Sequence, residues 1–342
     1  MEKKSKITNM HDVANKANVS HMTVSRVFNN PKLVSKKTKE KIIKIIKDLN
    51  YKPNLIAKSM RTNKTNTIGL VLPNIINPFF PEIVKGIDDY SKKNNYGVII
   101  INTEDDYNNQ IISLEMLIER KIDGLLNITS GRDEDKKIIN DIIINRKIPM
   151  VLIDRYILGT NCSHVSTDNF KAAFDATNYL IKLGHKKIGV ISPPLKINIF
   201  FNRLRGYKQA LKNNNIIYNK NYIKEYKESI ENGYAASKKI FADNNGITAI
   251  LAMCDFMAFG AYKYCKENKV NIPNDLSVIS IDDIFASALL TPPLTTMAQQ
   301  KYKMGYTAAK ILIESIKKNK LPEKQITLNA LLTERESCKC IC

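Results

Sequence analysis

From Thr67 onward, short apolar runs alternate with segments long enough to form helices, and this alternation constrains the fold more than any other feature. Strands separated by helices form βαβ units, whose strands lie parallel in a sheet that helices cover on both faces. The pattern begins again at His164, so we expect two successive sheets. The strands expected in the first sheet are 68–72, 97–101, 124–128 and 151–153, and those expected in the second are 165–167, 187–191, 249–252 and 276–280. The expected helices are 79–94, 108–120, 133–146, 169–183 and 256–268.

Two α/β lobes of this kind form a cleft between them, at the carboxyl ends of their strands, where open parallel sheets bind ligands. An enzyme could use the same cleft, so catalytic motifs must be sought directly. The sequence has no phosphate-binding loop, dinucleotide fingerprint, zinc-protease motif or nucleophile elbow. Of its four histidines, His11 and His21 lie in the N-terminal segment, and His185 follows a helix stop. These observations favour a binding domain over an enzyme.

The formal net charge of +20 is concentrated near the N-terminus. Residues 1–64 contain 16 Lys and Arg residues against four Asp and Glu residues. A local excess of positive charge is what binding to a polyanion requires. The N-terminal segment is therefore a candidate nucleic-acid-binding module.

This segment has the spacing of three short helices, with a turn at 18–20 between the first two. The expected apolar faces are Met10, Val13, Ala14 and Ala17 in the first helix, Val24, Val27 and Phe28 in the second, and Ile42, Ile45, Ile46 and Leu49 in the third. Asn9, Ser20 and Ser35 stand where the helices begin and can accept hydrogen bonds from the first free N–H groups.

The opposite face of the second helix is polar or adaptable, as a helix that enters the major groove requires. Arg26 can present a fork to a guanine edge, and Ser25 and Asn29 can reach phosphates or bases. His21 and Met22, at the start of the helix, would lie closest to the base edges. The residues of this helix expected to contact DNA are Ser20, His21, Met22, Thr23, Ser25, Arg26 and Asn29.

Long stretches of the chain resemble the lac repressor family of bacterial regulators. The N-terminal stretches are Asp12-Val13-Ala14, Val19-Ser20, Thr23 to Val27, Asn29 and Tyr51 to Asn54. Later ones include Asn77-Pro78-Phe79-Phe80, Leu183-Gly184-His185, Arg203 to Tyr207, Ile281-Asp282-Asp283 and Arg335-Glu336-Ser337. The resemblance covers nearly the whole chain. It implies a transcription regulator, acting as a repressor, whose DNA affinity responds to a small molecule.

The resemblance also implies a short hinge helix at 54–61 that orders only on DNA. Isolated helices under about 12 residues are marginal in water, which agrees with that behaviour. The hinge adds Asn54, Ala57 and Met60 to the expected DNA contacts. Ala57 would lie at the floor of the minor groove and Met60 would be the wedge between base pairs, where leucine is usual.

By position, the same resemblance implies which side chains line the cleft. Phe79 and Phe80 would come from the first lobe, and Arg203 and Asp282 from the second as the main polar contacts. An arginine fork and a carboxylate can hold adjacent sugar hydroxyls, while aromatic faces pack against an apolar ring surface. Further candidates are Asp154, Asp168, Cys254 and Asp255, of which the first two each end a strand and could simply cap the next element. The implied effector is a sugar or sugar derivative, and no cofactor is expected.

Two positions depart from the family pattern. Cys254-Asp255 stands where Asn-Asp is usual, which removes one amide from the cleft. An aromatic residue commonly precedes the helix at Gly233-Tyr234, but residues 225–229 read Glu-Tyr-Lys-Glu-Ser. Tyr226 could supply the missing ring after a small insertion.

The expected domains are a helix-turn-helix DNA-binding domain with its hinge over 1–62, an effector-binding domain over 66–337 and a tail over 338–342. Lobe one is expected at about 66–163 and 301–326, and lobe two at about 164–300 and 327–337. The six cysteines are scattered, so we expect reduced thiols. The tail, Cys-Lys-Cys-Ile-Cys, lacks a second ligand pair and lies at an end expected to fray, so no metal site is expected.

One helix-turn-helix covers half of a site, so we expect a homodimer on a palindromic DNA operator. The residues after Ser337 are too few to form a coiled coil of heptads, so we do not expect a tetramer. No run approaches the roughly 20 apolar residues that span a bilayer, and the N-terminus has no apolar signal region, so we expect a cytoplasmic protein. Two alternatives stay open: control by a phosphocarrier protein partner, and a non-catalytic solute-binding protein, which would have no use for the basic module.

Overall fold

The computed structural model describes residues 9–51, 64–243 and 246–341. The chain divides into two compact units, Met1–Thr65 and Asn66–Cys342. The expected hinge at 54–61, with Asn54, Ala57 and Met60, lies outside the described residues.

The N-terminal unit is a small helical bundle, and its helices begin where the sequence predicts. They are α1 Met10–Ala17, α2 His21–Asn29 and α3 Lys36–Asp48, with one 3-10 turn, Pro31–Leu33, before α3. The side chains of Asn9, Ser20 and Ser35 each accept a hydrogen bond from a backbone N–H in the first turn of the following helix. The apolar faces meet in one core that includes Val13 and Ile42.

Two side chains of α2 differ from the prediction. Phe28, expected in the core, is 39% exposed, with its ring centroid 6.3 Å from that of Tyr51. Ser25, expected on the DNA-facing side, is only 5% exposed. Ser25 lies about 100° around the helix from Val24, at the border of the apolar stripe. Neighbouring side chains cover the short side chain of Ser25, whereas the large ring of Phe28 extends beyond its neighbours.

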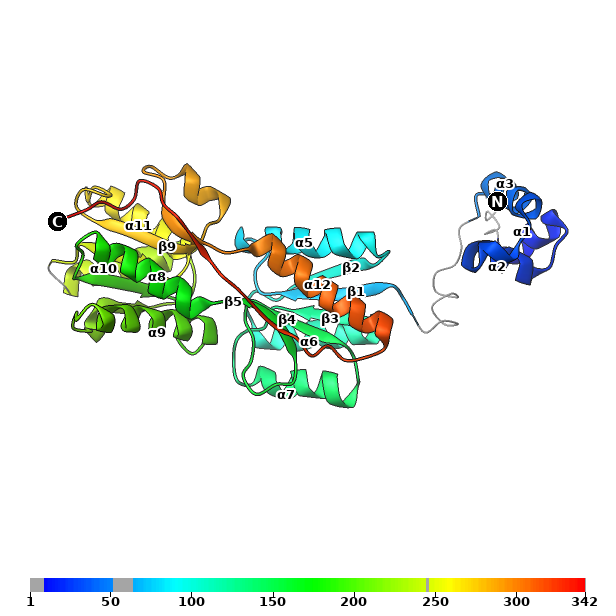
Figure 1. The fold of residues 1–342 in the computed structure, drawn as a ribbon, viewed down its shortest axis with the longest axis horizontal. Coiled ribbons are helices and arrows are strands. Elements are labelled where there is room, and N and C mark those ends of the chain that lie inside the picture. Colours follow the sequence, from blue (N-terminus) through cyan, green and yellow to red (C-terminus); the bar gives the residue numbers. More distant parts are fainter. Residues whose placement is uncertain (1–8, 52–63, 244–245, 342) are drawn as a thin grey trace, which may run out of the picture. The chain divides into compact units, whose positions relative to one another are not determined.

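The second unit contains two six-stranded sheets flanked by helices (Figure 1). The first has the order β11-β5-β4-β3-β1-β2 and is parallel throughout. Its strands are β1 Thr67–Leu72, β2 Gly97–Asn102, β3 Gly124–Asn127, β4 Met150–Ile153, β5 Ser163–Thr167 and β11 Gln325–Leu328. Its helices are α5 Phe79–Lys93, α6 Tyr107–Glu119, α7 Asp135–Asn140 with a π-turn at Asp141–Asn145, and α12 Lys301–Lys318. The consecutive residues Leu70 and Val71 of β1 enter separate cores, so both faces of this sheet are buried.

Helices α5 and α12 lie side by side on the first sheet because two glycines allow their backbones to meet (Figure 1). A Cβ added at Gly86 would lie 2.2 Å from the carbonyl oxygen of Tyr302. A Cβ added at Gly305 would lie 2.0 Å from the carbonyl oxygen of Ile83. Both distances are far below van der Waals contact, so only glycine fits this crossing without a shift of the helices.

The second sheet has the order β12-β10-β9-β8-β6-β7, and its edge strand β12 is antiparallel to β10. Its strands are β6 Ile188–Ser192, β7 Ile223–Glu225, β8 Ala249–Ala252, β9 Ser277–Asp282, β10 Thr295–Ala298 and β12 Leu331–Thr333. Its helices are α8 Asn169–Lys182, α9 Asn198–Asn213, α10 Ile230–Asp243 and α11 Asp255–Glu267, with 3-10 turns at Lys220–Tyr222 and Phe285–Leu289. Helices α8 and α9 pack as one pair and α10 and α11 as another.

The expectation that 165–167 belongs to the second sheet is wrong. Strand β5 pairs with β4 and β11, so it is part of the first sheet. Parallel neighbours usually require a crossover of a dozen or more residues, commonly a helix. The segment 154–162 between β4 and β5 is shorter and contains no helix, which made the sequence look as though a new sheet began.

The chain passes between the lobes three times: from β5 into α8, from β10 into α12, and from β11 into β12. The C-terminal tail packs on the second lobe, contrary to the expected fraying. The backbone N–H of Lys339 donates to the Ser277 hydroxyl, and that of Ile341 donates to the carbonyl of Leu183. Among the described residues, no helix is long and apolar enough to span a bilayer, and no cluster of side chains could hold a metal ion.

Candidate functional site

A pocket lies between the two lobes, at the carboxyl ends of strands from both sheets. Its walls are Asn77, Phe79, Phe80, Asp154, Arg155, Ile199, Phe200, Arg203, Glu228, Cys254, Asp282 and Gln299. Asn77 and the two phenylalanines follow β1, and Asp154 and Arg155 follow β4. The remainder follow strands of the second sheet, except Asp282, which is the last residue of β9. The pocket encloses about 20 Å³, room for little more than one water molecule.

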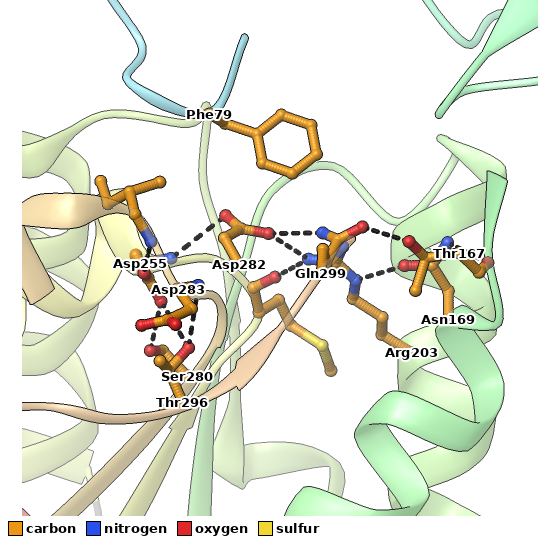
Figure 2. A network of polar contacts seen from close by, with 12 residues as sticks. Phe79, Thr167, Asn169, Arg203, Asp255, Ser280, Asp282, Asp283, Thr296 and Gln299 are labelled. Carbon is orange, nitrogen blue, oxygen red and sulfur yellow. Dashed lines mark hydrogen bonds and ion pairs between the residues drawn. The ribbon is translucent and has the colours of Figure 1, made fainter. Parts of the chain in front are cut away.

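Arg203 and Asp282 form the polar centre of the pocket (Figure 2). Arg203 is 1% exposed, and Nη1 of its guanidinium lies 3.6 Å from Oδ1 of Asp282. Its Nε donates to Oδ1 of Asn169 at 2.7 Å, and Nη1 also donates to the carbonyl of Met253. The Asp282 carboxylate accepts hydrogen bonds from Nε2 of Gln299 at 2.7 Å and from the backbone N–H of Asp255 at 3.4 Å. The guanidinium is therefore fixed in place by groups outside the pocket.

Aromatic rings flank this centre. The Phe79 and Phe80 rings meet edge to face, with centroids 5.3 Å apart, and Figure 2 shows Phe79 above the Asp282 and Gln299 network. From the second lobe, the Phe200 ring lies 5.4 Å from the guanidinium carbon of Arg203. The pocket thus combines ring surfaces from both lobes with a buried arginine and carboxylate.

Glu228 is a pocket residue that the sequence reasoning missed. Its Oε1 accepts a hydrogen bond from Nδ2 of Asn77 at 2.7 Å, and its Oε2 lies 3.6 Å from Nη2 of Arg155. Both partners belong to the first lobe, so this side chain reaches across the cleft. Tyr226, proposed as the aromatic residue of this segment, packs instead in the core beside α10 and α11. Only its place in the sequence could have indicated that Glu228 lines the pocket. It directly precedes Ser229, whose hydroxyl accepts from the N–H of Asn232 at the start of α10.

The backbone conformations of Asp154 and Asp282 are unusual. Their φ angles are 60° and 141°, in a region that L-residues rarely adopt and that is common at functional sites. Asp154 is 4% exposed, and its Oδ1 has no hydrogen-bond partner among the described residues. Burial raises the pKa of Asp154, Glu228 and Asp282, and the charge of Arg203 opposes that rise at each carboxyl group.

Two of the expected cleft residues do not line the pocket. Asp168 caps α8 by accepting from the N–H of Lys171 at 2.9 Å, as its place at the end of a strand allowed. Asp255 lies beneath the pocket, and Figure 2 shows it beside Ser280 and Thr296. Its expected contact with an effector stays a prediction, but four donors of the second lobe already occupy its carboxylate. They are the hydroxyls of Ser280, Ser287 and Thr296 and the N–H of Ile284, at 2.5, 2.5, 2.9 and 2.8 Å.

Of the other expected residues, Phe79, Phe80, Asp154, Arg203, Cys254 and Asp282 all line the pocket. The Cys254 thiol occupies the N-cap position of α11, and burial raises its pKa well above the ordinary value. It is therefore a neutral, weakly polar group. The lining residues that sequence reasoning did not name are Asn77, Arg155, Ile199, Phe200, Glu228 and Gln299.

In the N-terminal unit, the start of α2 presents exposed side chains. Met22 is 60% exposed, and Ser20, His21 and Arg26 are also exposed, while Thr23 is half-buried. The His21 ring stacks on that of His11, with centroids 4.7 Å apart, so α1 helps to fix its orientation. The side chain of Asn29 lies outside the described part of the unit.

Comparison with known proteins agrees with both units. Residues 9–54 match the family model described as bacterial regulatory proteins, lacI family. Residues 177–338 match the model described as periplasmic binding protein-like domain. The ribose operon repressor of Haemophilus influenzae is 34% identical over 328 residues, which cover 96% of this chain and 98% of the relative.

Solved structures show the same fold. The lac repressor dimer bound to operator and the anti-inducer ONPF matches with a TM-score of 0.88 and 25% identity, over 98% of this chain and 100% of that one. A LacI family transcriptional regulator from Enterococcus faecium with bound ribose matches with a TM-score of 0.73 and 29% identity, over 81% and 100% of the two chains. Since one relative is 34% identical over nearly the whole chain, this protein belongs to the lacI family of bacterial regulatory proteins.

Proposed function

We propose that this protein is a repressor whose affinity for a palindromic operator is set by a sugar bound in the interlobe pocket. Membership of the lacI family makes the chain a DNA-binding transcriptional regulator and not an enzyme. The observation that carries the choice of a sugar is the meeting of Arg203, Asp282 and the Phe79 ring in one pocket.

The chemistry of these groups suits a polyhydroxylated ring. A guanidinium donates to hydroxyl oxygens, a carboxylate accepts from hydroxyl hydrogens, and an aromatic face covers the apolar side of the ring. Arg203 is held by Asn169 and the Met253 carbonyl, so little conformational entropy is lost when a ligand binds it. The Enterococcus faecium structure supports a sugar, since that related regulator carries ribose.

Effector binding must move the lobes. The enclosed volume of about 20 Å³ is far below the roughly 300 Å³ or more of an ordinary ligand pocket. Asn77 and Arg155 of the first lobe contact Glu228 of the second, so a sugar has to separate these pairs. The three chain crossings allow the lobes to change their angle while remaining attached. A change in lobe angle is the kind of two-state element that can couple two binding sites.

A homodimer completes the proposal. Arg26 and Met22 lie on a single exposed recognition helix, which reads half of a site, and two copies read a palindrome. The related lac repressor is bound to its operator as a dimer. Effector and operator then change each other's affinity by the same factor, typically about 5- to 150-fold.

Selection of bound sequences from a random DNA pool, with and without each of a set of neutral, amino and phosphorylated sugars, tests this function. We expect one palindrome to be enriched and one class of sugar to change its retention. A palindrome that no sugar affects would refute control by a sugar. Failure to enrich any sequence would refute operator recognition itself.

A further inference from the structure

We propose that the effector is a sugar that carries a protonated amine, and that the Glu228 carboxylate selects it. This inference rests on the proposed function, because it assumes that the interlobe pocket receives a sugar. It goes further by naming the charge of that sugar and the residue that reads it.

The first argument is the balance of charge in the pocket. Its walls contain three carboxyl groups, on Asp154, Glu228 and Asp282, but two guanidinium groups, on Arg155 and Arg203. One of these cations is already shared, because Nη1 of Arg155 lies 2.5 Å from Oδ1 of a further acid, Asp105. Acidic groups therefore outnumber the positive charges available to them.

Lys301 lies behind Asp282 but does not correct this balance. Its ammonium donates to the backbone carbonyls of Asp282 and Asp283, at 2.9 and 2.6 Å. Its nearest carboxylate is that of Glu82, at 3.4 Å. The lysine thus neutralises an acid outside the pocket.

The second argument is the quality of the existing pairs. Both arginine to carboxylate contacts within the pocket walls, Arg155 to Glu228 and Arg203 to Asp282, measure 3.6 Å, longer than a hydrogen bond. Buried charges are costly unless they are paired and hydrogen-bonded. Burial accordingly raises the pKa of all three pocket carboxyl groups, which are short of positive partners.

The third argument is that two buried polar atoms of the walls are unpartnered. Oδ1 of Asp154 and Nε of Arg155 have no hydrogen-bond partner among the residues that the structure describes. The first is an acceptor that needs a donor, and the second is a donor that needs an acceptor. An amino sugar supplies both, since its ammonium donates to carboxylates and its hydroxyl oxygens accept from the guanidinium.

The same balance disfavours other sugar classes. A phosphorylated sugar would add about two negative charges to a pocket that already has surplus carboxylates. A neutral sugar would donate hydroxyl hydrogens to Glu228 but would leave its charge unpaired. A protonated amine is the substituent that relieves the excess.

Matched pairs of sugars test this inference directly. Binding to the full-length protein is measured by calorimetry for glucose and glucosamine, for cellobiose and its diamino counterpart, and for glucose 6-phosphate. We expect the amino member of a pair to bind about tenfold or more tightly than its neutral partner, because a charge pair forms in a desolvated site. We expect no binding of the phosphate.

The variant Glu228→Gln keeps the shape of the side chain and removes its charge, so the preference for the amine should fall to near parity. Glu231→Gln, an exposed position in the first turn of α10, is the matched control and should keep the preference. The comparison of amino and neutral sugars on the wild-type protein does not depend on how well either variant folds. Thermal unfolding shows whether the two variants are folded.

The outcomes separate this inference from the proposed function. Equal or tighter binding of the neutral or phosphorylated sugar overturns the inference and leaves sugar control standing. Retention of the amine preference by Glu228→Gln also overturns it. Failure of every sugar to bind would refute the proposed function, and the inference with it.

Discussion

We predict that Asp255 supports the second lobe and does not contact an effector, and replacement of this residue tests that prediction. Its carboxylate is buried and accepts from three hydroxyls and one backbone N–H, at distances of 2.5–2.9 Å. These donors come from β9, the turn at Phe285–Leu289, the residue before it and β10. In Asp255→Ala, four buried donors lose their acceptor at once.

The magnitude follows from those contacts. Each unsatisfied buried donor costs about 1–3 kcal/mol, but the hydroxyls can rotate toward other acceptors, so the losses do not add fully. Breaking a buried charged network typically costs about 3–5 kcal/mol. At about 2–4 °C per kcal/mol for a domain of comparable size, the effector-binding unit should melt roughly 10 °C lower. In Asp255→Asn, which keeps one acceptor oxygen for the N–H of Ile284, the cost should be about 1–2 kcal/mol.

Thermal and denaturant unfolding measure the loss, and calorimetry below the melting temperature measures effector affinity. We expect affinity within about twofold of wild type for Asp255→Asn, because no atom of Asp255 lines the pocket. An Asp255→Asn protein with unchanged stability and abolished effector binding would refute this account.

Three further predictions concern other parts of the molecule. Arg26→Ala should weaken binding to the selected operator by about 1–3 kcal/mol and weaken binding to random DNA much less; equal losses in a salt-matched titration would contradict base readout. Gly305→Ala should lower unfolding stability by about 1–3 kcal/mol, because its Cβ would lie 2.0 Å from the Ile83 carbonyl oxygen; an unchanged midpoint in urea would show that the helices separate freely. Burial lowers the pKa of His185 below its ordinary 6.5, so stability from the neutral ring is present above pH 6.5 and is lost as the pH falls through the folded-state pKa. The ring contacts the hydroxyl of Thr248 at 2.9 Å. His185→Gln should therefore make the melting temperature depend less steeply on pH between pH 7 and 5; an unchanged slope would show that other groups cause the pH dependence.

The elements that the sequence predicted well are those fixed by local interactions. Asn9, Ser20 and Ser35 cap helices through contacts within three residues, so their role is visible without tertiary structure. Strand β5 was assigned to the wrong sheet because the segment 154–162, which joins it to its neighbour β4, contains no helix to signal a parallel pair. Its partner β11 lies about 160 residues further along the chain.

The residues of the candidate site also divide into those that the sequence predicted and those that it did not. Arg203 and Asp282 stand in stretches that resemble the family, and both line the pocket. Glu228 lies in a stretch that departs from the family, and an acid in a polar loop looks like any surface residue. Asp255 was expected to line the cleft, because the sequence does not show that three hydroxyls and an N–H converge on its carboxylate.

The contact between Asn77 and Glu228 makes the protein its own competitor for the pocket. The Asn77 amide is tethered beside the Glu228 carboxylate at a high local concentration, so an effector must displace this amide in order to bind the carboxylate. If this internal contact holds nine molecules in ten closed, the measured dissociation constant is about tenfold above the intrinsic one. A substitution at Asn77 would then adjust the effector concentration to which the regulator responds while leaving Arg203 and Asp282 untouched. The effector concentration that gives a response and the choice of effector therefore depend on different residues of one cleft.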